Sequence, residues 1–184
     1  MFIQTEQTPN PATLKFLPGK DVMGEGVVDF ADESSAAGSP LARRLFAVDG
    51  VSGVHLGHDF ISVTKSEMED WYLLKPAILG AIMDHYMSGD PVIEDGANLP
   101  EDVQIDENDE TVKQIKELID TRVRPAVAQD GGDIVFHGFD RGVVYLHMRG
   151  ACAGCPSSTI TLKNGIENLL RYYVPEVVEV RSIG

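Results

Sequence analysis

A strongly acidic stretch divides this chain into two parts. Nine acidic residues and no basic ones lie between Asp90 and Glu110, together with two prolines and no periodic spacing of apolar residues. Because like charges repel and extend such a segment, we interpret residues 90–109 as a linker. An acidic recognition segment is the alternative interpretation. The 184 residues are then expected to build two small domains, residues 1–89 and residues 110–184.

Residues 1–89 have the pattern of a β-rich domain with two helices. Ser39-Pro40 is a typical helix start, and a second helix should end at Ser88-Gly89. Proline is unfavourable in a helix interior, so Pro76 leaves the starting point of this second helix open. The first two strands are expected to form an antiparallel pair and the last two a β-hairpin. The strand-like runs are residues 2–7, 12–17, 27–30, 54–56 and 60–63. This pattern predicts an α+β domain.

Residues 110–184 have the order α-β-β-α-β. The first helix begins near Glu110 and is ended or kinked at Pro125. The remaining elements are expected at residues 134–139, 143–148, 156–173 and 177–183. This order predicts a three-stranded sheet with the helices on one face. A core of this size is marginal alone, so dimerisation or cofactor binding would add stability.

The two cysteines of the chain lie together between a predicted strand and a predicted helix. Cys152 and Cys155 have the spacing Cys-x-x-Cys, on a loop that follows Gly150 and precedes Pro156. Proline suits the first position of a helix, where the N–H that it lacks would have no partner. Both thiols would then lie at the positive end of a helix dipole, which favours the thiolate that binds metal. We therefore predict Cys152 and Cys155 as the functional residues.

A Cys-x-x-Cys pair has several possible interpretations. A redox dithiol in a thioredoxin-like fold is one, although 29 residues after Cys155 are too few to complete that fold. A zinc site is another, and His137 or His147 would have to supply the missing ligands. The third is half of an iron–sulfur site, and the last is two cysteines buried as small apolar side chains.

The ligand count bears on the iron–sulfur interpretation. A 4Fe–4S cluster is usually held by four thiolates, which two chains related by a two-fold axis can supply as two copies of Cys152 and Cys155. This arrangement predicts a homodimer bridged by the cluster. A cluster shared between subunits on an exposed loop would be easy to load and to lose, which suits transfer. A 2Fe–2S cluster could use the same four thiolates.

The sequence around the cysteines also resembles a known family. Asp130-Gly131-Gly132-Asp133 and the run from Gly150 to Thr159 are similar to the C-terminal domain of NifU and of Nfu-type iron–sulfur carriers. Residues 1–88 resemble the Nfu N-terminal domain through the runs Thr8 to Phe16 and Trp71 to Pro76.

This resemblance implies a scaffold or carrier that assembles a 4Fe–4S cluster on Cys152 and Cys155 of two protomers and passes it to apo-proteins. It also implies an upstream cluster-assembly scaffold as a partner, and an N-terminal domain that helps to engage clients. We interpret Asp130 and Asp133 as turn-forming residues rather than as groups that act on iron. A dithiol/disulfide redox protein is the alternative function.

Composition and charge exclude other classes. The net charge of −14 without a basic stripe argues against binding of nucleic acid or of an anionic membrane. The sequence has no phosphate-binding loop, paired carboxylates or nucleophile–base arrangement, so we do not expect an enzyme. His55, His58 and His85 are scattered and are expected to be surface or structural residues. Without a signal or transit peptide at the start, we expect a cytoplasmic bacterial protein, or a mitochondrial matrix protein already processed.

Overall fold

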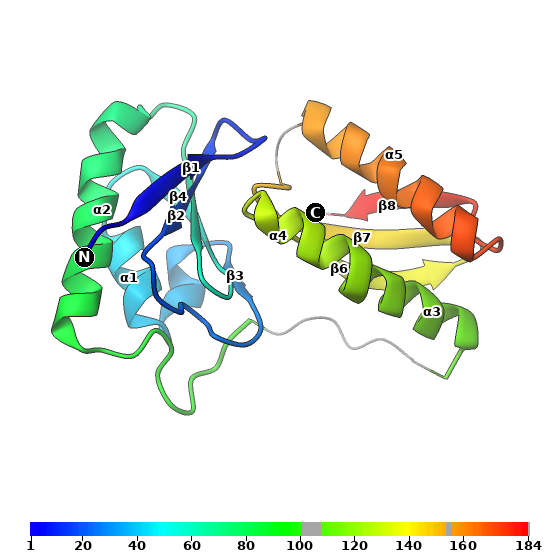
Figure 1. Cartoon of the computed structure of the whole chain (residues 1–184), viewed down its shortest axis with the longest axis horizontal. Helices are drawn as coiled ribbons and strands as arrows, with labels where there is room; N and C mark the ends of the chain where they lie inside the picture. The colour runs from blue at the N-terminus through cyan, green and yellow to red at the C-terminus, as the bar shows by residue number, and fades with distance from the viewer. Residues whose placement is uncertain (101–107, 154–155, 184) are drawn as a thin grey trace. The chain divides into compact units, whose positions relative to one another are not determined.

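The structure is a computed structural model that describes residues 1–100, 108–153 and 156–183, and the backbone alone of residues 156–158. The chain forms two units, Met1–Pro100 and Glu101–Gly184 (Figure 1). Each unit has its own hydrophobic core. Both units combine helices with a sheet, so the predicted α+β class is confirmed. No helix among the described residues is long and apolar enough to span a membrane.

The first unit contains a five-stranded antiparallel sheet. Its strands are β1 (Gln4–Gln7), β2 (Thr13–Leu17), β3 (Val28–Phe30), β4 (Val51–Leu56) and β5 (Ile61–Lys65). They lie in the order β1-β2-β5-β4-β3. The predicted antiparallel pair is β1 and β2, and the predicted hairpin is β4 and β5. Both predictions are confirmed.

Two helices pack against this sheet. Helix α1 (Pro40–Phe46) begins at Ser39, whose hydroxyl accepts a hydrogen bond of 3.1 Å from the backbone N–H of Ala42. Helix α2 (Trp71–Ser88) begins after Asp70 and continues through Pro76, which settles the starting point that the sequence left open. The buried face of α2 carries Leu74, Ile78 and Ile82, as the apolar spacing predicts. A short 3-10 helix, η1 (Glu33–Ala36), precedes α1.

The segment after α2 is anchored to the first unit. The backbone N–H of Glu94 donates to the carbonyl of Gly38, and the Ser39 hydroxyl donates to the carbonyl of Val92 at 2.7 Å. Val92, Ile93 and Leu99 pack against the core. The charge of residues 90–109 led us to expect an extended linker. Residues 92–99 instead pack on the first unit, because apolar side chains within the acidic stretch contact its core. The domain boundaries inferred from the sequence remain a prediction, and residues 101–107 lie outside the described residues.

The histidines of the first unit lie within its scaffold. His55 and His85 are buried, and the ring of His55 contacts the Asp29 carboxylate at 3.2 Å. Burial, with the nearby Arg44 cation, lowers the pKa of His85. His58 is exposed and its ring bonds to the carbonyl of Gly24. These positions agree with surface or structural roles.

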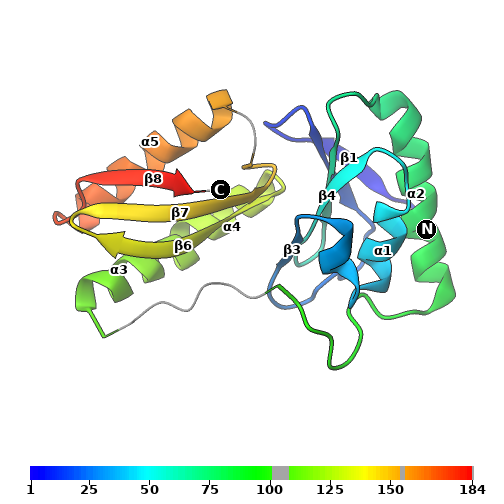
Figure 2. The same cartoon turned by 180° about the vertical axis from the view of Figure 1, so that it is seen from behind.

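The second unit follows the predicted α-β-β-α-β order. Its elements are α3 (Glu110–Leu118), the π-helical turn η2 (Ile119–Val123), α4 (Arg124–Gln129), β6 (Gly132–Asp140), β7 (Val143–Gly150), α5 (Pro156–Tyr173) and β8 (Glu179–Ile183). The sheet order is β6-β7-β8, with β7 antiparallel to β6 and parallel to β8. Figure 2 shows the sheet with its helices behind it, so they cover one face as predicted.

A π-helical turn accommodates Pro125 in the first helical segment. Proline cannot donate a backbone hydrogen bond in a helix interior. The turn η2 precedes it, and the N–H of Arg124 reaches back to the carbonyl of Ile119. Helix α4 then starts with Pro125 in its first turn. The helix is therefore modified at the proline rather than ended there.

Candidate functional site

The cysteine loop begins where β7 ends. Gly132 and Gly150 face each other at the ends of β6 and β7, and Gly150 has a φ of 60°, a conformation that glycine adopts at little cost. The backbone N–H of Ala151 donates to the carbonyl of Gly131, and that of Cys152 donates to the carbonyl of Arg149. The loop is therefore fixed to the start of β6. The predicted strand end at Gly150 and the predicted helix start at Pro156 are both confirmed.

Cys152 is packed into the core of the second unit. It is 6% exposed and belongs to the same apolar cluster as Met148 and Ile134. Its sulfur lies against Gly132, because a Cβ at that position would be 2.3 Å from it. The hydroxyl of Thr159 on α5 donates to the carbonyl of Cys152 at 3.3 Å. Strand β6, strand β7 and helix α5 thus all fix this residue.

The environment of Cys152 favours the neutral thiol. Burial raises its pKa to about 12, and the carboxylates of Asp133 and Asp130 add to the rise. A hydrogen bond from the backbone N–H of Asp133 acts in the opposite direction. The sequence led us to expect a lowered pKa for this thiol, and that expectation was wrong for Cys152: loss of water around the buried sulfur disfavours the thiolate and raises the pKa.

The second predicted residue, Cys155, lies outside the described residues. The same holds for Gly154 between them. The assignment of Cys152 and Cys155 as the functional pair therefore remains a prediction.

The two histidines considered as zinc ligands lie next to each other on β6 and β7. The rings of His137 and His147 have centroids 5.4 Å apart and meet edge to face. His147 lies between the buried Leu146 and Met148 on β7. Because successive side chains of a strand point to opposite faces, the His147 side chain lies on the face of the sheet opposite the core that contains Cys152. Among the described residues, no group of three or more potential metal ligands comes together.

An ion pair next to the loop was not predicted from the sequence. Asp133 is 3% exposed, and both of its carboxylate oxygens accept hydrogen bonds of 2.9 Å from the guanidinium of Arg124. The interpretation of Asp133 as a turn-forming residue is wrong, because it lies in β6 and its side chain is held by this pair. Asp130 does lie at the turn after α4, followed by Gly131 with a φ of 80°. A buried aspartate on a strand needs a cationic partner, since an unpaired buried charge is costly. Arg124, nine residues before Asp133 in the sequence, is that partner.

Comparison with known proteins covers both units. A family model described as "Scaffold protein Nfu/NifU N terminal" matches residues 3–89, and one described as "NifU-like domain" matches residues 115–181. The chain is 52% identical over its 184 residues to "NFU1 iron-sulfur cluster scaffold homolog, mitochondrial" from Drosophila sechellia, and 50% identical to the protein of that name from Drosophila willistoni. It spans 65% and 64% of the length of these two relatives, respectively.

Solved structures resemble parts of the chain. The solution structure of a NifU-like protein from Saccharomyces cerevisiae is 30% identical, with a TM-score of 0.42, over 52% of this chain and 86% of that one. A crystal structure of a Staphylococcus aureus protein is 25% identical, with a TM-score of 0.39, over 45% of this chain and 99% of that one.

The sequence matches define the class of protein. An Nfu N-terminal domain is followed by a NifU-like domain that carries both cysteines of the chain. The chain belongs to the Nfu family.

Proposed function

We propose that this chain is an iron–sulfur cluster carrier that binds a 4Fe–4S cluster between two protomers and passes it to apo-proteins. Cys152 and Cys155 of each protomer are the ligands. The cluster is cargo that leaves unchanged, so the proposal involves no catalysis. The observation that carries it is the Cys-x-x-Cys pair at the strand-to-helix loop of a NifU-like domain.

The chemistry of the described part of the site fits such a cargo. Thiolate sulfur is a soft ligand that suits iron–sulfur clusters. One chain offers two cysteine thiols, so a cluster with four thiolate ligands requires two chains. Because the Cys152 thiol is buried and neutral, binding requires that its sulfur become accessible and lose its proton.

Anaerobic reconstitution tests the proposal. The full chain is incubated with ferrous iron and sulfide under reducing conditions, and iron, sulfide and molecular size are measured on one sample. We expect about four irons and four sulfides per dimer, since one 4Fe–4S cluster takes four thiolates, and a smaller apo-protein. Cys152→Ser and Cys155→Ser should each lose the cluster. A Ser variant that retains a full cluster would contradict the assignment.

A matched double variant separates the carrier from a zinc protein. Replacing His137 and His147 together with Ala removes the histidines that a zinc site would need, while both cysteines remain. Cluster uptake by this variant should equal that of the unmodified chain. Loss of cluster binding, or one zinc per two chains in the unmodified protein, would favour the zinc interpretation.

The dithiol redox alternative makes a different prediction. An attacking cysteine in thiol–disulfide exchange needs an accessible thiolate. The neutral, buried Cys152 does not fit that role, and Cys155 lies outside the described residues. The carrier should therefore not reduce an insulin disulfide at thioredoxin-like rates as a monomer. Such turnover would support the redox function.

Partners and location follow from the proposed function. The clients are apo iron–sulfur proteins, and an upstream cluster-assembly scaffold supplies the cluster. The Drosophila relatives are named mitochondrial, which supports the mitochondrial matrix over the bacterial cytoplasm as the place of action. Residues 1–89 serve client recognition and residues 110–184 hold the cluster, with the acidic stretch between them.

A further inference from the structure

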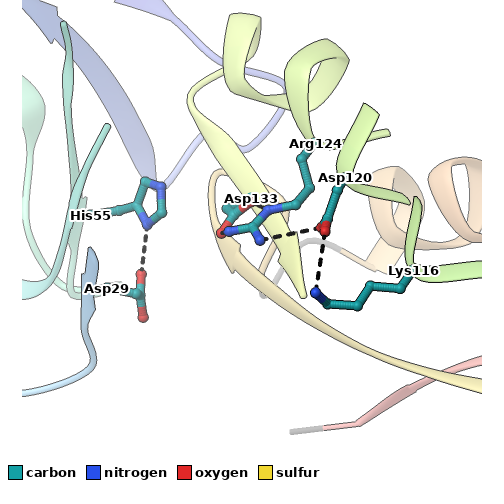
Figure 3. A network of polar contacts seen from close by, with 6 residues as sticks. All are labelled: Asp29, His55, Lys116, Asp120, Arg124 and Asp133. Carbon is teal, nitrogen blue, oxygen red and sulfur yellow. Dashed lines mark hydrogen bonds and ion pairs between the residues drawn. The ribbon is translucent and has the colours of Figure 1, made fainter. Parts of the chain in front are cut away.

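The buried Asp133 is held by one arginine. Nε of Arg124 lies 2.9 Å from Oδ1 of Asp133, and Nη2 lies 2.9 Å from Oδ2 (Figure 3). This two-pronged geometry is the strongest form of an arginine–carboxylate contact. The Asp133 side chain is 4% exposed and that of Arg124 25%. Since an unpaired charge at this depth is costly, the position of Asp133 depends on Arg124.

The helix before the sheet fixes Arg124 in turn. Arg124 directly follows the π-helical turn η2, and its Nη1 lies 3.5 Å from Oδ1 of Asp120. Asp120 also contacts the amine of Lys116 at 3.8 Å (Figure 3). Lys116, Asp120 and Arg124 thus form a ladder of alternating charges.

Asp133 connects this ladder to the cysteine loop. It directly follows Gly132, the residue of β6 against which the sulfur of Cys152 packs. The preceding Gly132 leaves no room for a side chain between β6 and that sulfur. A shift of β6 at Asp133 would therefore move one wall of the space that holds the Cys152 sulfur.

We propose that Arg124 is a positioning residue for the proposed cluster site, acting through Asp133 to hold the start of β6 against Cys152. This inference rests on the proposed function for its meaning, because it assigns Arg124 a role in presenting the cluster ligand. The contact keeps Cys152 shielded in the free protein and fixes the place from which its sulfur must emerge to bind iron.

Alkylation of Cys152 by iodoacetamide tests the inference without iron. The full chain carries Cys155→Ser, so that Cys152 is the one remaining thiol, and is combined with Arg124→Gln, Arg124→Lys or Lys116→Gln. Loss of a charged, buried hydrogen-bond pair should speed alkylation about ten- to hundredfold in Arg124→Gln. Arg124→Lys keeps the positive charge but cannot donate two parallel hydrogen bonds to Asp133, so its alkylation rate should be intermediate. Lys116→Gln weakens a partly exposed contact of 3.8 Å with Asp120 and leaves both hydrogen bonds from Arg124 to Asp133 in place, so its rate should match the unmodified background.

The urea dependence of the rate separates positioning from general stability. Local movement of the loop exposes little surface, so the alkylation rate should vary little with urea at low concentrations. Global unfolding would give a slope equal to that of equilibrium unfolding. Faster alkylation with a shallow slope in the Arg124 variants supports the inference. The inference is overturned if Arg124→Gln is alkylated no faster than the Cys155→Ser background. It is also overturned if the faster alkylation has the same urea dependence as global unfolding.

A second measurement connects the result to the cluster. In the chain with both cysteines, reconstituted Arg124→Gln should lose its cluster to an iron chelator about tenfold faster than Lys116→Gln does. Equal loss rates overturn the role of Arg124 toward the cluster. Failure of the unmodified chain to take up iron would overturn the proposed function instead, while the alkylation rates would still decide whether Arg124 positions Cys152.

Discussion

At the scale of single residues, the state of the Cys152 thiol can be measured directly. Burial raises its pKa to about 12 from an ordinary value of 9.0. In the Cys155→Ser background, the alkylation rate should therefore rise by about tenfold per pH unit through pH 9 and show no plateau there, because thiolate is the reactive form. The same chain in urea should plateau near the ordinary pKa. A folded-state plateau at or below pH 9 would contradict this environment.

The same shift couples protonation to stability. An acid whose pKa is higher in the folded state than in the unfolded state contributes stability that is fully present below the unfolded pKa. That contribution is lost as the pH rises through the folded pKa. For Cys152 the loss falls between about pH 9 and about pH 12. Cys152→Ala should remove this part of the alkaline destabilisation, as measured by the urea midpoint at several pH values.

Gly132 offers a matched pair of substitutions within one strand. A Cβ at Gly132 would lie 2.3 Å from the Cys152 sulfur and 2.9 Å from its backbone nitrogen, whereas one at Gly138 meets nothing within 4 Å. Gly132→Ala should lower the free energy of unfolding by about 1–3 kcal/mol, the typical cost of overpacking. Gly138→Ala should change it by less than about 0.5 kcal/mol, as measured by urea denaturation. Equal effects of the two substitutions would show that Cys152 does not occupy this space.

At the scale of elements, the acidic segment after α2 contributes to the first unit. Val92, Ile93 and Leu99 pack on its core, and the buried Ser39 hydroxyl bonds to Val92. A fragment of residues 1–100 should therefore be about 1–3 kcal/mol more stable than a fragment of residues 1–89, which loses these apolar contacts. Urea denaturation of the two fragments measures the difference.

The ion pair between Arg43 and Glu94 provides the control for that comparison. Both side chains are about half exposed, so the pair contributes little in water. Arg43→Gln in the longer fragment should cost less than about 1 kcal/mol. If Arg43→Gln accounts for the whole difference between the fragments, then surface charge rather than apolar packing holds the segment.

Elements were predictable where the local pattern agrees with the tertiary environment. The strand that ends at Gly150 and the helix that starts at Pro156 follow from alternation and from proline chemistry, and both were predicted from the sequence. The π-helical turn before Pro125 was not, because a proline in a helical pattern indicates a disruption but not its form. The raised pKa of Cys152 was missed because it depends on burial in a core that several helices and strands form together. The contact of Arg124 with Asp133 was missed for a similar reason: it needs the helix and the sheet to pack.

At the scale of the whole molecule, the two units should divide the work. The cysteines belong to the second unit, and the first has its own core and contains no cysteine. A fragment of residues 108–184 should therefore take up iron and sulfide and become a dimer in doing so, because two chains are needed for four thiolates. A fragment of residues 1–100 should fold, remain a monomer under the same conditions and bind no iron. Sizing and iron analysis of both fragments check this, with Cys152→Ser in residues 108–184 as the control that stays monomeric. Stoichiometric iron on residues 1–100, or a dimer of residues 108–184 that forms equally without iron, would contradict a cluster that bridges the protomers.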